Sequence, residues 1–288
     1  MSGIVTLLAR SAIVVAAACP LATLGPSDRW PATALLAYAP PPCVIALALS
    51  ALFALGRRPE RNTAWLAPGL AAVILSVIAL VDDARRTGPA ASSEGASILH
   101  WNVASRDLAG GLDDDILCLS EAPASLSFSG RARHVCREGN LVVASRWPVE
   151  RRAFWRGTHA KALHVVVHAD RPVSLVLADV YPSLRRARRD AIAELAAAVR
   201  VMDPWPHVLV GDLNTPDHAW SLSPLRASFA DAHRLAGSGA GHTWPAWLPL
   251  MRIDHAFARP DVHVVAYRTG ADLRSDHLWQ RMVVRLPR

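Results

Sequence analysis

Residues 207–214 read His207-Val208-Leu209-Val210-Gly211-Asp212-Leu213-Asn214, an apolar run that ends in a glycine, a carboxylate and an amide. A short apolar run bounded by turn residues is typical of a strand inside a sheet. Polar residues that directly follow such a strand lie on a loop at the edge of the sheet, where functional groups concentrate. The stretch therefore predicts a buried strand that delivers chemical groups to a sheet edge.

Similar runs recur through the last two thirds of the chain. They cover residues 98–103, 116–119, 141–144, 163–167, 174–180, 253–258, 262–267 and 281–286, and several are rich in Val and Ile. Helical periodicity is clearest over residues 184–202, where Ile192, Leu195 and Val199 share one face, and a second helix is predicted over residues 218–225. Strands that outnumber interleaved helices predict an α/β layered sandwich.

The first third of the chain has a different character. Three nearly uncharged runs, at about residues 4–24, 30–55 and 63–81, each approach the ~20 residues that a membrane-spanning helix needs. Arg10 interrupts the first run and three prolines at 40–42 interrupt the second. An alternative for the first run is a cleaved signal peptide. The sequence thus predicts a membrane region over residues 1–81, a polar linker over 82–96 and a folded domain over 97–288.

The arginines predict the orientation, because cytoplasmic loops collect Lys and Arg. Arg57, Arg58 and Arg61 lie between the second and third apolar runs, which places that loop inside. We expect a multi-pass protein of the cell membrane whose folded domain lies on the extracytoplasmic side. Arg85 and Arg86 argue for the opposite orientation.

Five segments of the folded domain end in oxygen or imidazole groups. These groups are Asn102, Glu121, Asp212 with Asn214, Asp254, and Asp276 with His277. Carboxylate oxygens suit Mg²⁺ or Mn²⁺, and no clustered Cys and His spacing indicates zinc. From residue 97 on, 24 Arg and Lys stand against 19 Asp and Glu, a mild excess that suits an anionic substrate or membrane surface.

Six blocks in order resemble the signatures of the endonuclease/exonuclease/phosphatase superfamily. They are His100-Trp101-Asn102-Val103, Leu119-Ser120-Glu121, Gly139-Asn140-Leu141-Val142, Gly211-Asp212-Leu213-Asn214, Arg252-Ile253-Asp254-His255 and Ser275-Asp276-His277. The resemblance implies a four-layer sandwich of two packed β-sheets flanked by helices. It also implies a metal-dependent hydrolase of phosphate esters, of the phosphodiesterase or nuclease type, with its active site at one edge.

The resemblance carries roles to matching positions. Asn102 and Glu121 resemble the first metal-binding pair, and Asp276 supports the metal. Asp212 resembles the residue that orients or deprotonates the attacking water. Asn140, Asn214 and His277 correspond to groups that contact the phosphate, and Asp254 to the residue that orients His277.

One position departs from the family pattern. The family places a His, or in some branches a Tyr, where this chain has Asp179, and Tyr181 stands two residues further on. Asp179 is a candidate proton donor to the leaving group, or a ligand of a second ion. The departure supports an alternative, a catalytically impaired membrane-anchored binding or scaffold protein with the same fold. For the enzyme, the candidate substrates are nucleic acids, phospholipid headgroups and small phosphate esters, and no protein partner is inferred.

Overall fold

The computed structural model describes residues 95–106, 112–128, 133–182, 188–270, 272 and 274–287. The three predicted membrane spans, and nearly all of the predicted linker, lie outside these ranges. Within them, no helix is long and apolar enough to cross a bilayer. The first strand of the described residues begins at Ala96, one residue before the predicted start of the folded domain.

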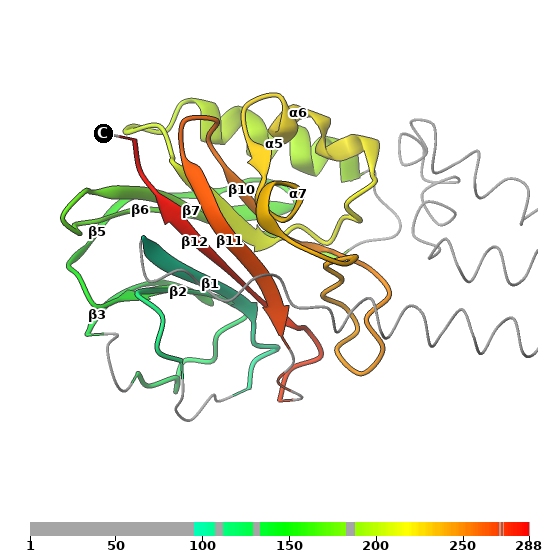
Figure 1. Cartoon of the computed structure of the whole chain (residues 1–288), viewed down its shortest axis with the longest axis horizontal. Helices are drawn as coiled ribbons and strands as arrows, with labels where there is room; N and C mark the ends of the chain where they lie inside the picture. Colours follow the sequence, from blue (N-terminus) through cyan, green and yellow to red (C-terminus); the bar gives the residue numbers. More distant parts are fainter. Residues whose placement is uncertain are drawn as a thin grey trace, which may run out of the picture.

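The described residues form two six-stranded sheets (Figure 1). The first sheet has the order β11-β12-β1-β2-β4-β3. Its strands are β1 (Ala96–Asn102), β2 (Ile116–Ser120), β3 (His134–Glu138), β4 (Leu141–Ser145), β11 (His263–Gly270) and β12 (Trp279–Arg285). The second sheet has the order β5-β6-β7-β8-β10-β9. Its strands are β5 (Val149–Arg156), β6 (Ala160–Val167), β7 (Val173–Val180), β8 (Val208–Asp212), β9 (Ala230–Asp231) and β10 (Asp254–Ala258).

Each sheet has one parallel pair near its centre, and all its other pairs are antiparallel. The parallel pairs are β1 with β2 and β7 with β8. Ligands of parallel sheets bind outside the carboxyl ends of the strands. The fold therefore offers two such ends, one from each sheet.

Helices α5 (Arg188–Arg200) and α6 (Ser223–Arg226) cover the second sheet. Helix α5 buries Ile192, Leu195 and Val199 against Val176 of β7 and Leu209 of β8. The predicted helix over 184–202 is confirmed from 188 to 200, and residues 184–187 lie outside the described ranges. The predicted helix over 218–225 is instead a 3-10 turn, η3 (Trp220–Leu222), followed by α6 (Ser223–Arg226). A further short helix, α7 (Ala232–Ala236), packs beside β10 and β11.

The two sheets differ in what the described residues place on their outer faces. The outer face of the first sheet, around Trp101 and Leu119, is packed by Leu112, Leu126 and Phe128. Their segment, residues 112–128, contains β2 and turns but no helix. The described residues thus show the two packed sheets of the predicted sandwich and a helical layer on the second sheet. Residues 107–111 and 129–132 lie outside the described ranges.

The interior between the two sheets is apolar over most of its length and polar at one end. Ile98 and Ile116 of the first sheet belong to the same buried apolar cluster as Leu163, Leu177 and Val210 of the second. Because side chains alternate between faces of a strand, every second residue continues this inner face. At the carboxyl ends of β1, β7 and β8, the next inward positions are polar, so the interior ends in a polar site.

Candidate active site

Four neighbouring strands of the second sheet place one charged residue each at the same level. The register pairs Lys161 with Asp179, Asp179 with Asp212, and Asp212 with Asp254. Directly paired residues of adjacent strands point to the same face of a sheet. We call Lys161, Asp179, Asp212 and Asp254 the charged row. All four are buried, and they continue the inner apolar face.

The first sheet adds Asn102 at the end of β1 and Glu121 immediately after β2. Glu121 has a left-handed backbone, with φ of 52°, and so has Asn214 after β8, with φ of 47°. Non-glycine residues in this conformation cost of order 1–3 kcal/mol each and cluster at functional sites. Two loops at this end of the sandwich thus hold a functional side chain on a strained backbone.

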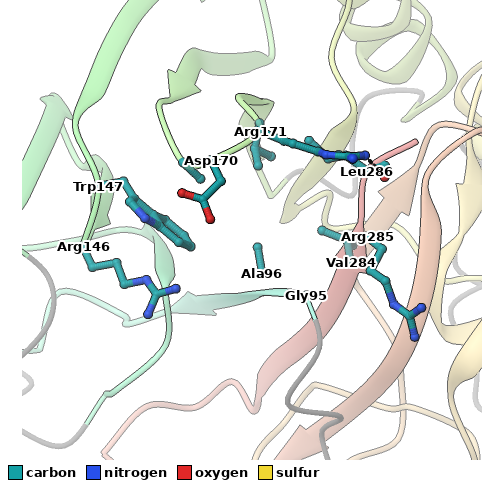
Figure 2. Close-up of a pocket in the computed structure, with 11 residues that line it drawn as sticks. Gly95, Ala96, Arg146, Trp147, Asp170, Arg171, Val284, Arg285 and Leu286 are labelled. Atoms are coloured by element: carbon teal, nitrogen blue, oxygen red, sulfur yellow. Dashed lines mark hydrogen bonds between the residues drawn. The ribbon is translucent and has the colours of Figure 1, made fainter. Parts of the chain in front are cut away.

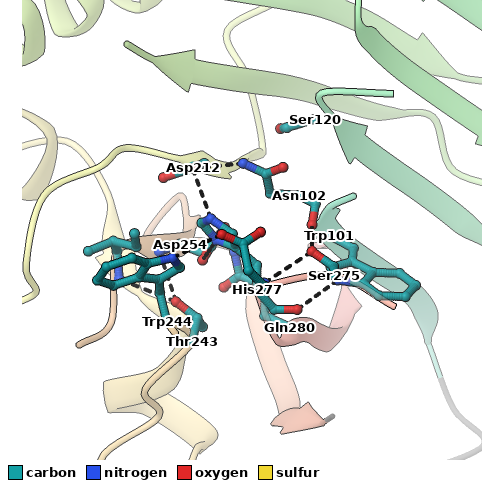
Figure 3. Close-up of polar contacts among 12 residues, drawn as sticks. Trp101, Asn102, Ser120, Asp212, Thr243, Trp244, Asp254, Ser275, His277 and Gln280 are labelled. Atoms are coloured by element: carbon teal, nitrogen blue, oxygen red, sulfur yellow. Dashed lines mark hydrogen bonds and ion pairs between the residues drawn. The ribbon is translucent and has the colours of Figure 1, made fainter. Parts of the chain in front are cut away.

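The amide of Asn102 joins the two halves of the site (Figure 3). Its Nδ2 donates to Asp212 Oδ2 at 2.9 Å and to Glu121 Oε1 at 3.2 Å. Its Oδ1 accepts from the backbone N–H of Ala104 at 3.0 Å, which fixes the orientation of the amide. Two carboxylates from different sheets therefore converge on one side chain.

Gly211, one residue before Asp212, allows β8 to lie close to β7. A Cβ atom at this position would stand 1.9 Å from the carbonyl oxygen of Ala178, which is backbone and has no freedom to move aside. The glycine of the stretch quoted first is thus required for the register that aligns Asp179 with Asp212.

Asp254 and His277 form a buried hydrogen-bonded pair. His277 Nδ1 lies 2.9 Å from Asp254 Oδ2, and the His277 side chain is 8% exposed. Burial alone would lower the pKa of His277, but the Asp254 charge, its hydrogen bond and the nearby Asp212 raise that pKa to about 10. His277 is therefore an imidazolium at neutral pH, with its Nε2–H directed away from Asp254.

Asp212 faces this imidazolium. The distance from His277 Nε2 to Asp212 Oδ2 is 3.8 Å, and the Asp212 side chain is almost fully buried. Burial, followed by the charge of Asp254, raises the pKa of Asp212 to about 8. A carboxylate with a pKa near neutral is a better base than an exposed one. Acid and base thus stand on opposite sides of a short gap.

The start of β10 is anchored on both sides of Asp254. Arg252, 1% exposed, donates from Nη1 and Nη2 to the two oxygens of Asp231 at 2.8 Å each. The backbone N–H of Asp254 donates to Thr243 Oγ1 at 3.2 Å. His255 turns to the other face and contacts the carbonyl of Thr215 at 2.7 Å through Nε2. These contacts fix Asp254 before it orients His277.

Three other predicted residues lie around this centre. Asn214 donates from Nδ2 to the carbonyl of Val180 at 2.8 Å, and its N–H donates to Asp212 Oδ1 at 2.8 Å. The backbone carbonyl of Asn140 accepts from Ala122 N at 2.9 Å, next to Glu121. Asp276 is exposed, and its Oδ2 accepts from Trp244 Nε1 at 3.3 Å. The structure thus gives Asn214 and Asn140 supporting contacts and places the Asp276 carboxylate on the rim.

Lys161 was not among the residues predicted from the sequence. Its Nζ lies 2.9 Å from Asp179 Oδ2, and the two side chains are 10% and 5% exposed. Burial raises the pKa of Asp179 while Lys161 opposes the increase, and the charges of Glu121 and Asp254 add to it. Asp179 therefore stands inside the site, next to the other acids.

The donor set fits a divalent cation. Asp212, Asp254 and His277 offer ligand atoms within 4.8 Å of one another. Because His277 is cationic and bonded to Asp254, we favour Glu121 and Asp212 as the oxygen donors, with Asn102 between them. Four carboxyl groups, Glu121 and the three of the charged row, converge here beside Lys161 and His277. A divalent ion would offset the repulsion among these carboxylates and favour the ionised form of Asp212.

A cavity of about 480 Å³ lies at the other end of the sandwich (Figure 2). It is lined by Ala96 at the start of β1, Val173 at the start of β7, Trp147, and Arg146 and Arg171. Arg171 donates to the carbonyls of Leu286 and Pro287, and Arg146 pairs with Asp115. The cavity is thus remote from the charged row. The candidate site is identified by its converging acids and His277 and does not coincide with this cavity.

Comparisons with known proteins identify relatives of this chain. The sequence model described as "Endonuclease/Exonuclease/phosphatase family" matches residues 99–277. A family protein of this description from Bacteroides thetaiotaomicron superposes with a TM-score of 0.50 at 13% identity, covering 69% of this chain and 100% of that one. No protein with a curated description matches the sequence.

Two further solved structures show weaker similarity. An endonuclease/exonuclease/phosphatase from Beutenbergia cavernae gives a TM-score of 0.47 at 20% identity, covering 67% of this chain and 72% of that one. A mannosyl-6-phosphatase from Bacteroides thetaiotaomicron gives 0.45 at 12% identity, covering 66% and 100%.

Proposed function

Because the chain belongs to the endonuclease/exonuclease/phosphatase family, we propose that it is a membrane-tethered, divalent-metal-dependent hydrolase of phosphate esters. The observation that carries the proposal is the opposition of Asp212 and His277 at 3.8 Å, with Asp254 behind the imidazole. A base and a charged donor that face each other across a gap suit the attack of water on an anionic phosphate.

Each residue has a part in this reaction. Asp212 accepts a proton from the attacking water, which its raised pKa favours. His277 donates a hydrogen bond from Nε2 to a phosphoryl oxygen, and Asp254 holds the ring for this purpose. Glu121 and Asp212, bridged by Asn102, would hold Mg²⁺ or Mn²⁺. The ion, when bound, supplies charge that offsets the charge developing on the phosphate.

The test uses the full-length chain in detergent or nanodiscs with Mg²⁺ or Mn²⁺. Plasmid DNA, sphingomyelin, phosphatidylinositol phosphates and bis(4-nitrophenyl) phosphate represent the candidate substrate classes. We expect turnover of at least one of them that chelation abolishes. Absence of turnover on all four, together with no metal binding by calorimetry, would refute the enzyme and favour the scaffold alternative.

Replacing Glu121 with Gln should weaken metal binding while the domain stays folded. The change removes one negative charge and one hard oxygen ligand, and we expect the affinity for Mn²⁺ to fall by about 10–100-fold. Isothermal titration calorimetry with Mn²⁺ measures the effect. Glu138→Gln is the matched control, since the Glu138 carboxylate pairs with Arg151 of β5 and not with Asn102 or Asp212. Equal Mn²⁺ affinity in the Glu121 and Glu138 variants would exclude Glu121 as a ligand.

We also propose that residues 1–81 tether the domain and place it outside the cytoplasm. The support is the apolar runs and the three arginines at 57, 58 and 61. A reporter that is active only outside the cytoplasm, fused after residue 288, should be active. A fusion with a reporter that is active only in the cytoplasm is the converse control, and activity of that fusion alone would reverse the proposed topology.

A further inference from the structure

Lys161 is distinctive in the composition of the chain. Of the 31 Lys and Arg residues, Lys161 is the single lysine. Arginine presents a planar fork of donors, whereas lysine presents a compact charge on a flexible stem. The site therefore contains the one lysine ammonium of the chain, a compact charge that suits a single oxygen atom rather than a flat, two-oxygen partner.

Its position is buried and held. Lys161 Nζ lies 2.9 Å from Asp179 Oδ2 and 5.3 Å from the centre of the Tyr181 ring. The neighbouring residues in β6, Ala160 and Ala162, point to the opposite, helix-covered face. A buried ion pair stabilises a fold little compared with apolar side chains of similar size. The fold alone thus gives no reason for a charge at this position.

The spacing of the charged row suits an in-line displacement. Asp179 separates Lys161 from Asp212, so two strand spacings, about 10 Å, lie between their backbones. In such a displacement the attacking and leaving oxygens lie on opposite sides of phosphorus. Lys161 and Asp212 lie on the same face of the sheet, on opposite sides of Asp179, and Lys161 Nζ is 2.9 Å from Asp179 Oδ2. This order suits a water activated at Asp212 and a leaving oxygen on the side of Lys161.

We propose that Lys161 is a catalytic residue that donates a hydrogen bond to the leaving-group oxygen, and that Asp179 is the positioning residue that holds its amine. The inference rests on the proposed function and assigns the step for which the chain lacks the family's His. The water oxygen forms a bond to phosphorus, and Asp212 takes the proton of that water. The bond from phosphorus to the leaving oxygen breaks with its electron pair on that oxygen. The ammonium stabilises this charge until solvent supplies a proton.

The test compares esters whose leaving groups need different degrees of charge stabilisation. The full-length chain with Mn²⁺ is assayed on a series of methylphosphate esters that runs from 4-nitrophenyl to ethyl. For Lys161→Met we expect kcat to fall about 100-fold on the ethyl ester but less than about 5-fold on the nitrophenyl ester. Lys161→Arg should also lose activity on the ethyl ester, because the fork does not replace the point charge.

Two controls separate chemistry from folding. Arg281→Met removes the partner of the buried Asp114 in the first sheet and should leave the leaving-group dependence unchanged. The double variant Lys161→Met/Asp179→Leu replaces both charges with apolar groups. If the Lys161–Asp179 pair were only structural, the double variant would regain activity. We expect instead that the ethyl ester remains a poor substrate of the double variant. Equal loss on every ester, or recovery in the double variant, would overturn the assignment.

A binding measurement distinguishes this inference from the proposed function. Because the chain has one lysine, labelling with ¹³C-lysine gives a single Cε signal in NMR spectra. Inorganic phosphate added with Mg²⁺ should shift this signal in the wild-type chain. Phosphate that binds by calorimetry without moving the signal contradicts the role of Lys161. Failure of the wild-type chain to hydrolyse any ester counts instead against the proposed function.

Discussion

Asp212→Asn should reduce kcat by about 10⁴-fold, close to the loss of all turnover, because the amide cannot accept a proton from the attacking water. The substitution keeps the size of the side chain and an oxygen that can still accept from Asn214 N, as Asp212 Oδ1 does at 2.8 Å. The fold should therefore persist. The initial rate on the best substrate of the panel measures the effect, and circular dichroism confirms the fold.

The control for Asp212 is another buried carboxylate. Asp114 is 3% exposed and pairs with Arg281, and it precedes β2, whereas Glu121 follows the other end of that strand. Asp114→Asn should lower the stability of the domain without a comparable loss of kcat. A kcat for Asp212→Asn within about tenfold of the wild type would mean that a different group activates the water.

Asp254→Asn should reduce kcat by about 10³-fold through its effect on His277. In the wild type, burial is outweighed by the Asp254 carboxylate and by Asp212, and the pKa of His277 rises to about 10. An amide at residue 254 removes the principal charge, so burial then favours the neutral ring and the Nε2 donor loses its positive charge. We expect the ¹⁵N spectrum of the His277 ring at neutral pH to change from imidazolium to neutral imidazole.

The neighbouring residue supplies the matched control. His255 is fully buried, but it faces Thr215 and stacks on Phe257, away from His277. His255→Gln should reduce stability and leave the His277 signals in place. If Asp254→Asn lowers kcat while His277 stays an imidazolium, the carboxylate has a role other than the one proposed.

The sequence predicted the interior strands and the edge strand β11, but it did not predict the edge strands β3, β5 and β9. The run before Asp212 and the run before Asp179 are continuous apolar segments, and both form central strands. By contrast β5, with four Arg or Glu among its eight residues, and β3 lie at sheet edges and were not predicted. These edge strands bury less surface and carry charges, so apolar periodicity does not mark them.

The candidate site was predicted as a list of residues and not as an arrangement. Asn102, Glu121, Asp212, Asp254 and His277 were all identified from strand ends and the family resemblance, and the structure brings them together. Lys161 was missed because the predicted strand began at residue 163, whereas β6 begins at Ala160. Lys161 is the single lysine of the chain, and this was the signal in the sequence that could have identified it. Cross-strand register, which pairs it with Asp179, depends on long-range packing.

The hydrogen bond from Asn102 to Asp212 joins the two sheets. Neither sheet alone therefore supplies all the residues of the site. A slip of one sheet along the other by a single residue, about 3.3 Å, would break that hydrogen bond. Most of the apolar contacts between the sheets would be replaced by other apolar contacts. The rate of catalysis would then report the alignment of the two sheets. Core substitutions distant from the charged row would lower kcat before they lowered the melting temperature.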